Sequence, residues 1–180
     1  MTRDEDAMLV QSCLRGDRHA FDELVDRYEG PIFSAAFRIT GSVEDAMDAT
    51  QNAFVNAYEK LHTFNPNYRF FSWIYRIAVN QALNLVGRRR DTSEFDGETR
   101  ASGPDPEKSF EAAEAGDHLQ QALLKLDPDY RAVVILKHLE GFSYREIGDL
   151  LEIPEKTVKS RLFTARQRLR AILTERGVTP

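Results

Sequence analysis

The chain of 180 residues has little with which to build a disulfide, a metal site or a membrane span. Cys13 is its only cysteine, and His19, His62, His118 and His138 show no metal-ligand spacing. No disulfide and no cysteine zinc site can form within the chain, which suits a reducing compartment. No hydrophobic run approaches the roughly 20 residues that span a membrane, and the acidic N-terminus does not resemble a signal peptide. These absences predict a cytoplasmic protein without membrane insertion and without a metal ion.

The sequence also lacks the usual signatures of enzymes. It contains no glycine-rich phosphate loop, and no pairing of a nucleophile with a base can be named. We therefore predict that the protein is not an enzyme and needs no cofactor. A nuclease remains an alternative, but no carboxylate cluster for a metal ion supports it.

Positive charge is scarce overall and unevenly distributed. The chain has 24 Lys and Arg against 29 Asp and Glu, a net charge of −5, with a pI near 5.4. Residues 65–90 nevertheless carry five arginines and no acid, and residues 128–180 have a net charge of +3. Residues 1–64 and 91–127 are strongly acidic. Local fields govern association with charged partners, so the two basic segments are the candidates for contact with nucleic acid.

The most informative stretch runs from Phe142 to Arg170. Ser143 followed by Glu146 is a capping box that predicts the start of a helix. Pro154 forces the residue before it out of the α region, so this helix should end there and a second should begin near Glu155. A short helix, a three-residue turn and a basic helix predict a helix-turn-helix, which places its second helix in the DNA major groove.

The second of these helices carries six basic residues and one acid from Glu155 to Ile172. Basic side chains suit phosphates, while Lys159, Ser160 and Thr164 have donors for base edges. The alternative is a solvated amphipathic helix whose arginines serve solubility. One face is predicted to hold Lys156, Lys159, Phe163, Arg166 and Arg170, flanked by Arg161 and Arg168.

In the rest of the chain, the sequence pattern predicts helices and no strands. In order, helices are expected at 4–14 (with Met8, Leu9, Cys13 and Leu14 inward), 18–28, 31–39 after a break at Gly30-Pro31, 43–61, 70–90, 111–126 and 128–140. Residues 91–110 are acidic and rich in Gly and Pro, which predicts a flexible linker. The fold class is therefore all-α: two small helical domains, 1–90 and 111–180, joined by an acidic linker at 91–110, with the helix-turn-helix in the second.

Two faces of the first domain stand out. On the helix at 43–61, Asp45, Asp48, Gln51, Asn52 and Asn56 form an exposed face of acids and amides, opposite a buried side of Val43, Met47, Thr50, Phe54, Ala57, Tyr58 and Leu61. On the helix at 70–90, Trp73, Arg76, Asn80, Asn84 and Arg88 recur on a face outside the core stripe. Rings interleaved with arginines suit single-stranded DNA. The alternatives are a solvated polar face and aromatic rings that belong to the core.

Three motifs in this order resemble the extracytoplasmic-function (ECF) sigma factors of bacterial RNA polymerase. Residues 45–51, DAMDATQ, resemble the family's DAxDxxQ motif. Residues 71–80, FSWIYRIAVN, resemble FxTWLYRIAxN. Residues 144–147 and 154–162, YREI and PEKTVKSRL, resemble YxEIA and PxGTVxSRL. The resemblance covers nearly the whole chain.

This resemblance implies a transcription initiation factor that binds core RNA polymerase, directs it to promoters and assists melting. Core binding to the largest-subunit clamp helices would use Asp45, Asp48 and Gln51, with a further contact at the flap region. The −10 element would be read by Tyr68, Trp73, Arg76, Asn80, Asn84, Arg88, Arg89 and Arg90. The −35 element would be read by Arg145, Lys156, Thr157, Lys159, Ser160, Arg161, Phe163, Thr164 and Arg166. The family also implies an anti-sigma factor as partner.

Three positions depart from the family pattern. Lys156 stands where Gly is common, and Thr164 where Arg is frequent, so the resemblance leaves the −35 sequence open. Gly148 replaces the usual Ala, which costs about 1 kcal/mol of helix propensity and allows closer helix packing. A stand-alone helix-turn-helix regulator with a sensing N-terminal domain remains the alternative function; it would bind DNA alone and would not need the acid-amide face.

Overall fold

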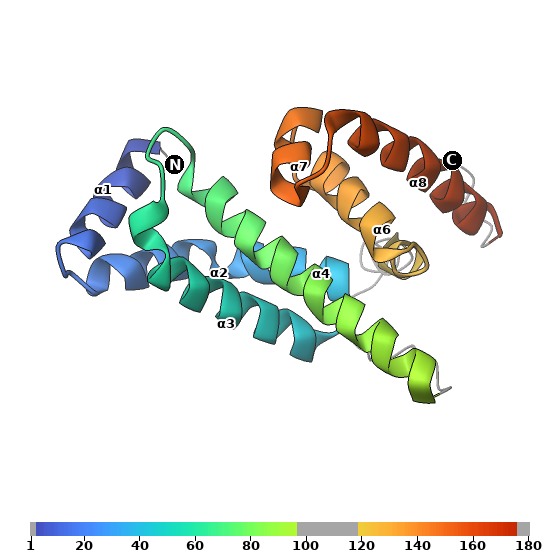
Figure 1. Ribbon diagram of the computed structural model, residues 1–180, viewed down its shortest axis with the longest axis horizontal. Coiled ribbons are helices and arrows are strands. Elements are labelled where there is room, and N and C mark those ends of the chain that lie inside the picture. The colour runs from blue at the N-terminus through green and yellow to red at the C-terminus, as the bar shows by residue number, and fades with distance from the viewer. Residues whose placement is uncertain (1–2, 97–118, 176–180) are drawn as a thin grey trace, which may run out of the picture.

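The computed structural model describes residues 3–96 and 119–175, and within these ranges it contains helices and no strand. The predicted all-α fold is confirmed. Figure 1 shows α1 to α4 grouped on one side and α6 to α8 on the other. The elements are α1 Arg3–Leu14, α2 His19–Thr40, α3 Val43–Glu59, the 3-10 turn η1 Leu61–Thr63, α4 Phe70–Asp96, a helical stretch at 119–124, α6 Pro128–Val134, the π-helix η2 Ile135–Leu139, α7 Tyr144–Leu151 and α8 Glu155–Glu175.

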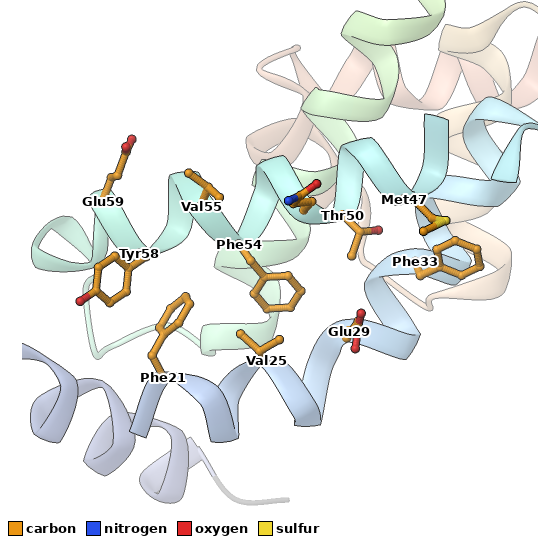
Figure 2. A pocket seen from close by; sticks show the side chains of 11 residues that line it. Phe21, Val25, Glu29, Phe33, Met47, Thr50, Phe54, Val55, Tyr58 and Glu59 are labelled. Atoms are coloured by element: carbon orange, nitrogen blue, oxygen red, sulfur yellow. The ribbon is translucent and has the colours of Figure 1, made fainter. Parts of the chain in front are cut away.

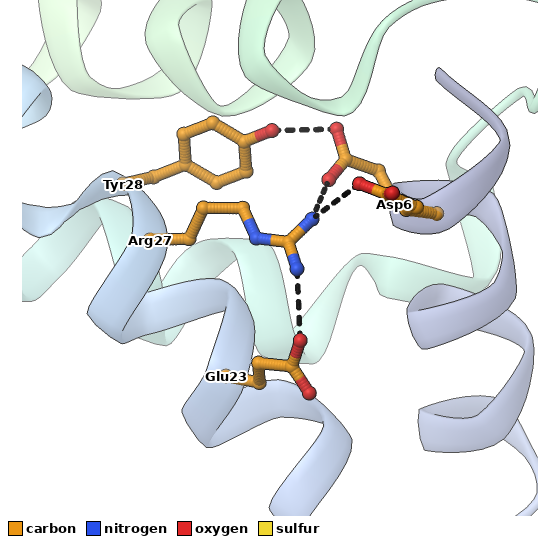
Figure 3. A network of polar contacts seen from close by, with 5 residues as sticks. Asp6, Glu23, Arg27 and Tyr28 are labelled. Atoms are coloured by element: carbon orange, nitrogen blue, oxygen red, sulfur yellow. Dashed lines mark hydrogen bonds and ion pairs between the residues drawn. The ribbon is translucent and has the colours of Figure 1, made fainter. Parts of the chain in front are cut away.

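The helices α2, α3 and α4 build the first half of the core, and α1 is fastened to α2 by a polar network (Figure 3). The buried Asp6 accepts a hydrogen bond of 2.5 Å from the Tyr28 hydroxyl and one of 2.9 Å from Arg27 Nη1. Arg27 also donates to Glu23 at 2.8 Å. Burial and the hydrogen bond to Asp6 raise the pKa of Tyr28, so its hydroxyl stays protonated and donates to Asp6. Because buried charges are tolerated when paired and hydrogen-bonded, this network fixes where α1 lies.

The predicted break at Gly30-Pro31 is wrong, because α2 runs unbroken from His19 to Thr40 with Pro31 inside it. Proline removes one helical hydrogen bond, a local cost. Leu24 and Ile32, on either side of the break, are both fully buried on the same face. A continuous helix keeps both in the core, while Gly30 and Pro31 lie on the exposed side, and this packing overrides the local signal.

Two helices bury faces that differ in part from those predicted: Thr50, Phe54, Ala57 and Leu61 are buried and Leu9 and Cys13 pack against the core as predicted, but other residues are not. On α3 the core side consists of Ala46, Ala49, Ala53 and Ala57 with Asp45, Thr50 and Phe54. Val43, Met47 and Tyr58, predicted to be inward, are 55%, 60% and 47% exposed. On α1, Met8 and Leu14 are likewise exposed, while Val10 and Asp6 are buried. Small alanines let α3 approach its neighbours closely, which turns its larger apolar residues outward.

The end of α4 differs from the predicted domain boundary. The helix continues past Arg90 to Asp96, so the first residues assigned to the linker are helical. The remaining linker residues at 97–110 lie outside the described residues, as does the first half of the helix predicted at 111–126, of which 119–124 is helical. The predicted helix at 128–140 is α6 followed by the π-helix η2.

The helix-turn-helix is confirmed. The Ser143 side chain accepts from the Glu146 N–H, and the Glu146 carboxylate accepts from the Ser143 N–H at 2.8 Å, which completes the capping box. These hydrogen bonds lower the pKa of Glu146. Glu152 ends α7 in the left-handed conformation, with φ 56°. The turn that follows leads through Pro154 into α8.

Gly148 is required by this turn, and Gly148→Ala is expected to destabilise the protein. A Cβ at this position would lie 2.8 Å from the Ile153 carbonyl oxygen, a backbone atom held in the turn. Alanine gains about 1 kcal/mol of helix propensity. Moving the backbone of a packed turn costs about 1–3 kcal/mol, so the clash outweighs the gain. Urea unfolding measures the sign. If Gly148→Ala instead raised the stability by the full difference in helix propensity between Ala and Gly, the backbone of the turn would move at no cost.

The two halves are packed against each other. Arg131 of α6 is buried and donates to the carbonyl oxygens of Leu123, Leu126 and, across the interface, Ile39 at the end of α2. The Tyr75 and Phe142 rings lie 5.4 Å apart. One hydrophobic cluster therefore extends through both halves. The domain division itself, 1–90 and 111–180, stays a prediction.

Candidate nucleic-acid and polymerase interfaces

The first candidate surface lies on the helix-turn-helix. The exposed residues among those predicted for the −35 element lie on α8, with one on α7. They share an outward direction away from the buried stripe of Val158, Leu162 and Ala165. They are Arg145, Lys156, Lys159, Ser160, Phe163 and Arg166. Phe163, 65% exposed, is the large apolar side chain in this set.

Three other predicted residues lie on a different side of α8. Thr157, Arg161 and Thr164 are half-buried. The Arg161 guanidinium pairs with Asp129 at 2.7 Å, and Arg168 pairs with Asp127 at 2.7 Å and stacks on the Tyr130 ring. The predicted −35 set therefore divides into an outward group and a half-buried group, in which Arg161 is engaged with the N-terminal turn of α6.

Two of the outward cations are held by neighbours that sequence reasoning missed. Lys159 Nζ lies 2.6 Å from the Glu155 carboxylate and over the Tyr144 ring, and the Glu155 bond raises its pKa. Arg166 donates to His138 Nε2 at 3.2–3.3 Å. Burial, Arg166 and Lys137 lower the pKa of His138, which keeps the ring neutral and able to accept. The Glu155 spacing was visible in the sequence, whereas His138 comes from another element.

The second candidate surface belongs to α4 and the loop before it. Tyr68, Asn84, Arg88 and Arg89 are exposed, and Tyr68 is 67% exposed. Trp73 and Asn80 are half-buried, with the Trp73 ring packed 5.5 Å from Phe64 and 5.7 Å from Phe70. Phe70 and Tyr75 are buried, so these two rings belong to the hydrophobic core, which is the alternative that the sequence left open for the aromatic residues. The Arg90 side chain lies outside the described residues.

Arg76, on the same face of α4, contacts the other half of the protein. Its guanidinium forms an ion pair with Glu152, the residue that ends α7. Nearby, Arg38 pairs with Glu140 at 3.3 Å. A predicted −10 residue therefore has a carboxylate of the helix-turn-helix as its partner in the free protein.

The predicted core-binding residues do not form one exposed face. Asp48 and Gln51 are exposed on α3 as predicted, but Asp45 is buried, with 6% of its surface exposed. Its carboxylate pairs with Arg89 of α4 at 2.8 Å. The prediction that Asp45 lies outside is therefore wrong, because the start of α3 packs under α4.

Beside Gln51, a groove of about 600 Å³ lies between α2 and α3. Figure 2 shows Phe21 and Val25 of α2 facing Phe54 and Tyr58 of α3, with Glu29 and Glu59 also lining the groove. The exposed Met47 and Val55 continue this apolar surface along α3. An apolar groove rimmed by acids is a surface that an amphipathic helix with basic flanks can cover.

Within the described residues, no group of three His, Cys, Asp or Glu side chains is placed to hold a metal ion. No helix there is long and apolar enough to span a membrane.

Comparisons with known proteins agree with the motifs. Residues 24–92 match Sigma-70 region 2, and residues 117–169 match Sigma-70, region 4. The chain is 33% identical to the ECF RNA polymerase sigma factor SigW of Bacillus subtilis, over 92% of this chain and 95% of the relative. It is 36% identical to the ECF RNA polymerase sigma-E factor of Escherichia coli K12, over 90% and 91%.

Solved structures agree as well. CnrH in complex with the cytosolic domain of CnrY superposes with a TM-score of 0.68 at 28% identity, covering 95% of this chain and 98% of that one. The sigma factor RpoE in complex with the anti-sigma factor NepR, from Bartonella quintana, gives 0.68 at 25% identity, covering 86% and 96%. Sequence motifs, helical architecture and nearly full-length similarity agree, and the chain belongs to the ECF sigma factors of bacterial RNA polymerase.

Proposed function

We propose that this protein binds core RNA polymerase and directs it to promoters by contacting a −10 and a −35 element, without enzymatic activity of its own. The observation that carries the proposal is the pair of exposed basic surfaces, one on α4 and one on α8, within a chain of net charge −5. Cations neutralise phosphates, while the acidic remainder disfavours non-specific binding.

At the −35 element, α8 enters the major groove with its outward group. Lys156 and Arg166 approach phosphates or base edges, and Ser160 has a hydroxyl for a base. Glu155 and His138 hold Lys159 and Arg166 in place before DNA arrives. Preordering these long side chains lowers the entropy cost of binding.

At the −10 element, α4 and the loop before it receive the melted strand. The exposed Tyr68 ring offers a face for a base, since aromatic stacking stabilises unpaired bases. Asn84, Arg88 and Arg89 follow along the exposed side of α4, where the arginines attract the backbone.

Core polymerase binds α3 through Asp48 and Gln51 and the apolar groove beside them. An anti-sigma factor is a further partner, as NepR is for the similar sigma factor RpoE of Bartonella quintana. The protein acts in the cytoplasm, where the polymerase is.

Transcription in vitro tests the proposal. Core polymerase with the protein should initiate at a subset of candidate promoters, and core alone should not. Specific binding of promoter DNA by the protein alone, with no effect on core polymerase, would favour the stand-alone regulator.

A matched pair of arginines on α8 tests the reading face. Arg166→Ala, in the outward group, should lower promoter affinity of the polymerase complex about tenfold, as expected for loss of a charge-assisted DNA contact of about 1–3 kcal/mol. Arg168→Ala makes the same change at the α6 contact and should leave promoter affinity within about twofold. Equal losses for both, measured by filter binding on one promoter, would show that the outward face does not select DNA.

A further inference from the structure

The ion pair between Asp45 and Arg89 joins the helix proposed for polymerase binding to the helix proposed for the −10 element. Asp45 lies in the first turn of α3, and its Oδ1 is 2.8 Å from Arg89 Nη2. The Asp45 side chain is 9% exposed, whereas that of Arg89 is 53% exposed. The acid is therefore enclosed by protein, while the arginine that it holds remains open to a ligand.

The local sequence leaves the Asp45 carboxylate available for this role. In a reciprocal capping box, the acid at this position accepts from the N–H of the capping serine. Here the Asp45 N–H donates to Ser42 Oγ at 3.3 Å, but the Ser42 N–H is directed to Thr40 Oγ1 at 3.3 Å. The carboxylate is not used in the cap and points to α4 instead.

This arrangement is unfavourable for the fold alone. Among the described residues, Asp45 Oδ2 is buried without a hydrogen-bond partner. Burial raises the pKa of the Asp45 carboxyl more than Arg89 lowers it. A buried carboxylate with an unsatisfied oxygen lowers stability relative to a neutral group. The presence of an acid at position 45 is therefore not explained by a contribution to the stability of α3.

Arg89 lies in the part of α4 that needs an anchor. Figure 1 shows α4 running past the start of α3 and projecting beyond the helical body. Gly87, Arg88 and Arg89 are exposed there, and Gly87 borders a hollow beside Pro128 and Tyr130 of α6. Helices without packing partners fray. The pair with Asp45 fixes Arg89, and with it the direction in which the basic end of α4 leaves the body.

We propose that Asp45 is a positioning residue for promoter DNA, which holds Arg89 and the basic end of α4 in place, and that it is not a contact for polymerase. This inference rests on the proposed function. It separates Asp45 from Asp48, one turn later, whose exposed carboxylate is free to meet a partner.

The test compares Asp45→Asn, Asp48→Asn and Arg89→Gln in the full chain, with core polymerase and a promoter fragment. Asp45→Asn should bind core within about twofold of wild type and unfold at an equal or higher temperature. Its polymerase complex should bind the promoter about three- to tenfold more weakly, and the variant combined with Arg89→Gln should be no weaker than Arg89→Gln alone. Asp48→Asn should show the reverse pattern, with weaker core binding.

Four results would overturn the inference. Core affinity that falls with Asp45→Asn as it does with Asp48→Asn would make Asp45 a polymerase contact. Promoter affinity unchanged by Asp45→Asn, or losses that add with Arg89→Gln, would show that the pair positions nothing. A lowered unfolding temperature with parallel loss of both affinities would assign a purely structural role. Failure of wild-type protein to direct core polymerase to any promoter would instead contradict the proposed function.

Discussion

Asp48→Arg is expected to abolish co-purification with core polymerase while leaving helix content and thermal unfolding near wild type. Asp48 is exposed on α3, one turn before Gln51 at the edge of the apolar groove. Reversing a charge within an interface leaves the partner's charge opposed and desolvated, a cost of about 2–5 kcal/mol or more. That range corresponds to at least about thirtyfold weaker binding.

Asp26→Arg provides the control. Asp26 is an exposed acid of α2 that does not line the groove, so the same change in net charge should leave core binding close to wild type. Pull-down with tagged protein and circular dichroism give both readouts. Core binding retained by Asp48→Arg, or loss of fold in that variant, would favour a solvated or structural face on α3.

The helix-turn-helix could be predicted closely because its signals are local. Ser143 and Glu146 cap each other within one turn, and Pro154 ends the preceding helix from within the turn. Such interactions depend on residues three to five positions apart, which a sequence displays directly. Gly148 could be predicted only in part. The sequence indicates closer helix packing at this glycine, but the approach of the Ile153 carbonyl oxygen depends on the geometry of the turn.

The features that could not be predicted depend on distant residues. Pro31 is tolerated in α2 because core residues on both sides of it share one buried face. Asp45 is buried because Arg89, 44 positions later, lies above it. Helical periodicity shows that the two sides of α3 differ. One side carries alanines and the other carries larger apolar residues, and the pattern alone does not decide which side faces the core. In the structure the alanine side packs against the core, and Met47 and Tyr58 are exposed.

The free protein is expected to bind promoter duplex weakly, and its polymerase complex tightly. The positions −10 and −35 lie about 25 base pairs apart, or about 85 Å along B-DNA. A compact chain of this length has a radius of gyration of about 16 Å and is about 40 Å across. Both elements can be contacted only if the two halves separate. In the free protein they are joined by Arg131 and by two ion pairs, Arg38–Glu140 and Arg76–Glu152.

Glu152→Gln tests this expectation, because it removes the carboxylate that occupies Arg76 on the proposed −10 face. Free Glu152→Gln protein should bind single-stranded −10 DNA severalfold more tightly than wild type, since exposed ion pairs contribute up to about 1 kcal/mol. Asp149→Asn removes one negative charge from the exposed side of α7 and serves as the control for net charge. Within the polymerase complex, where the halves are separated, Glu152→Gln should match wild type. Equal DNA affinities for free wild-type and Glu152→Gln protein, in a fluorescence titration at fixed salt, would show that the contact between the halves does not restrain the −10 face.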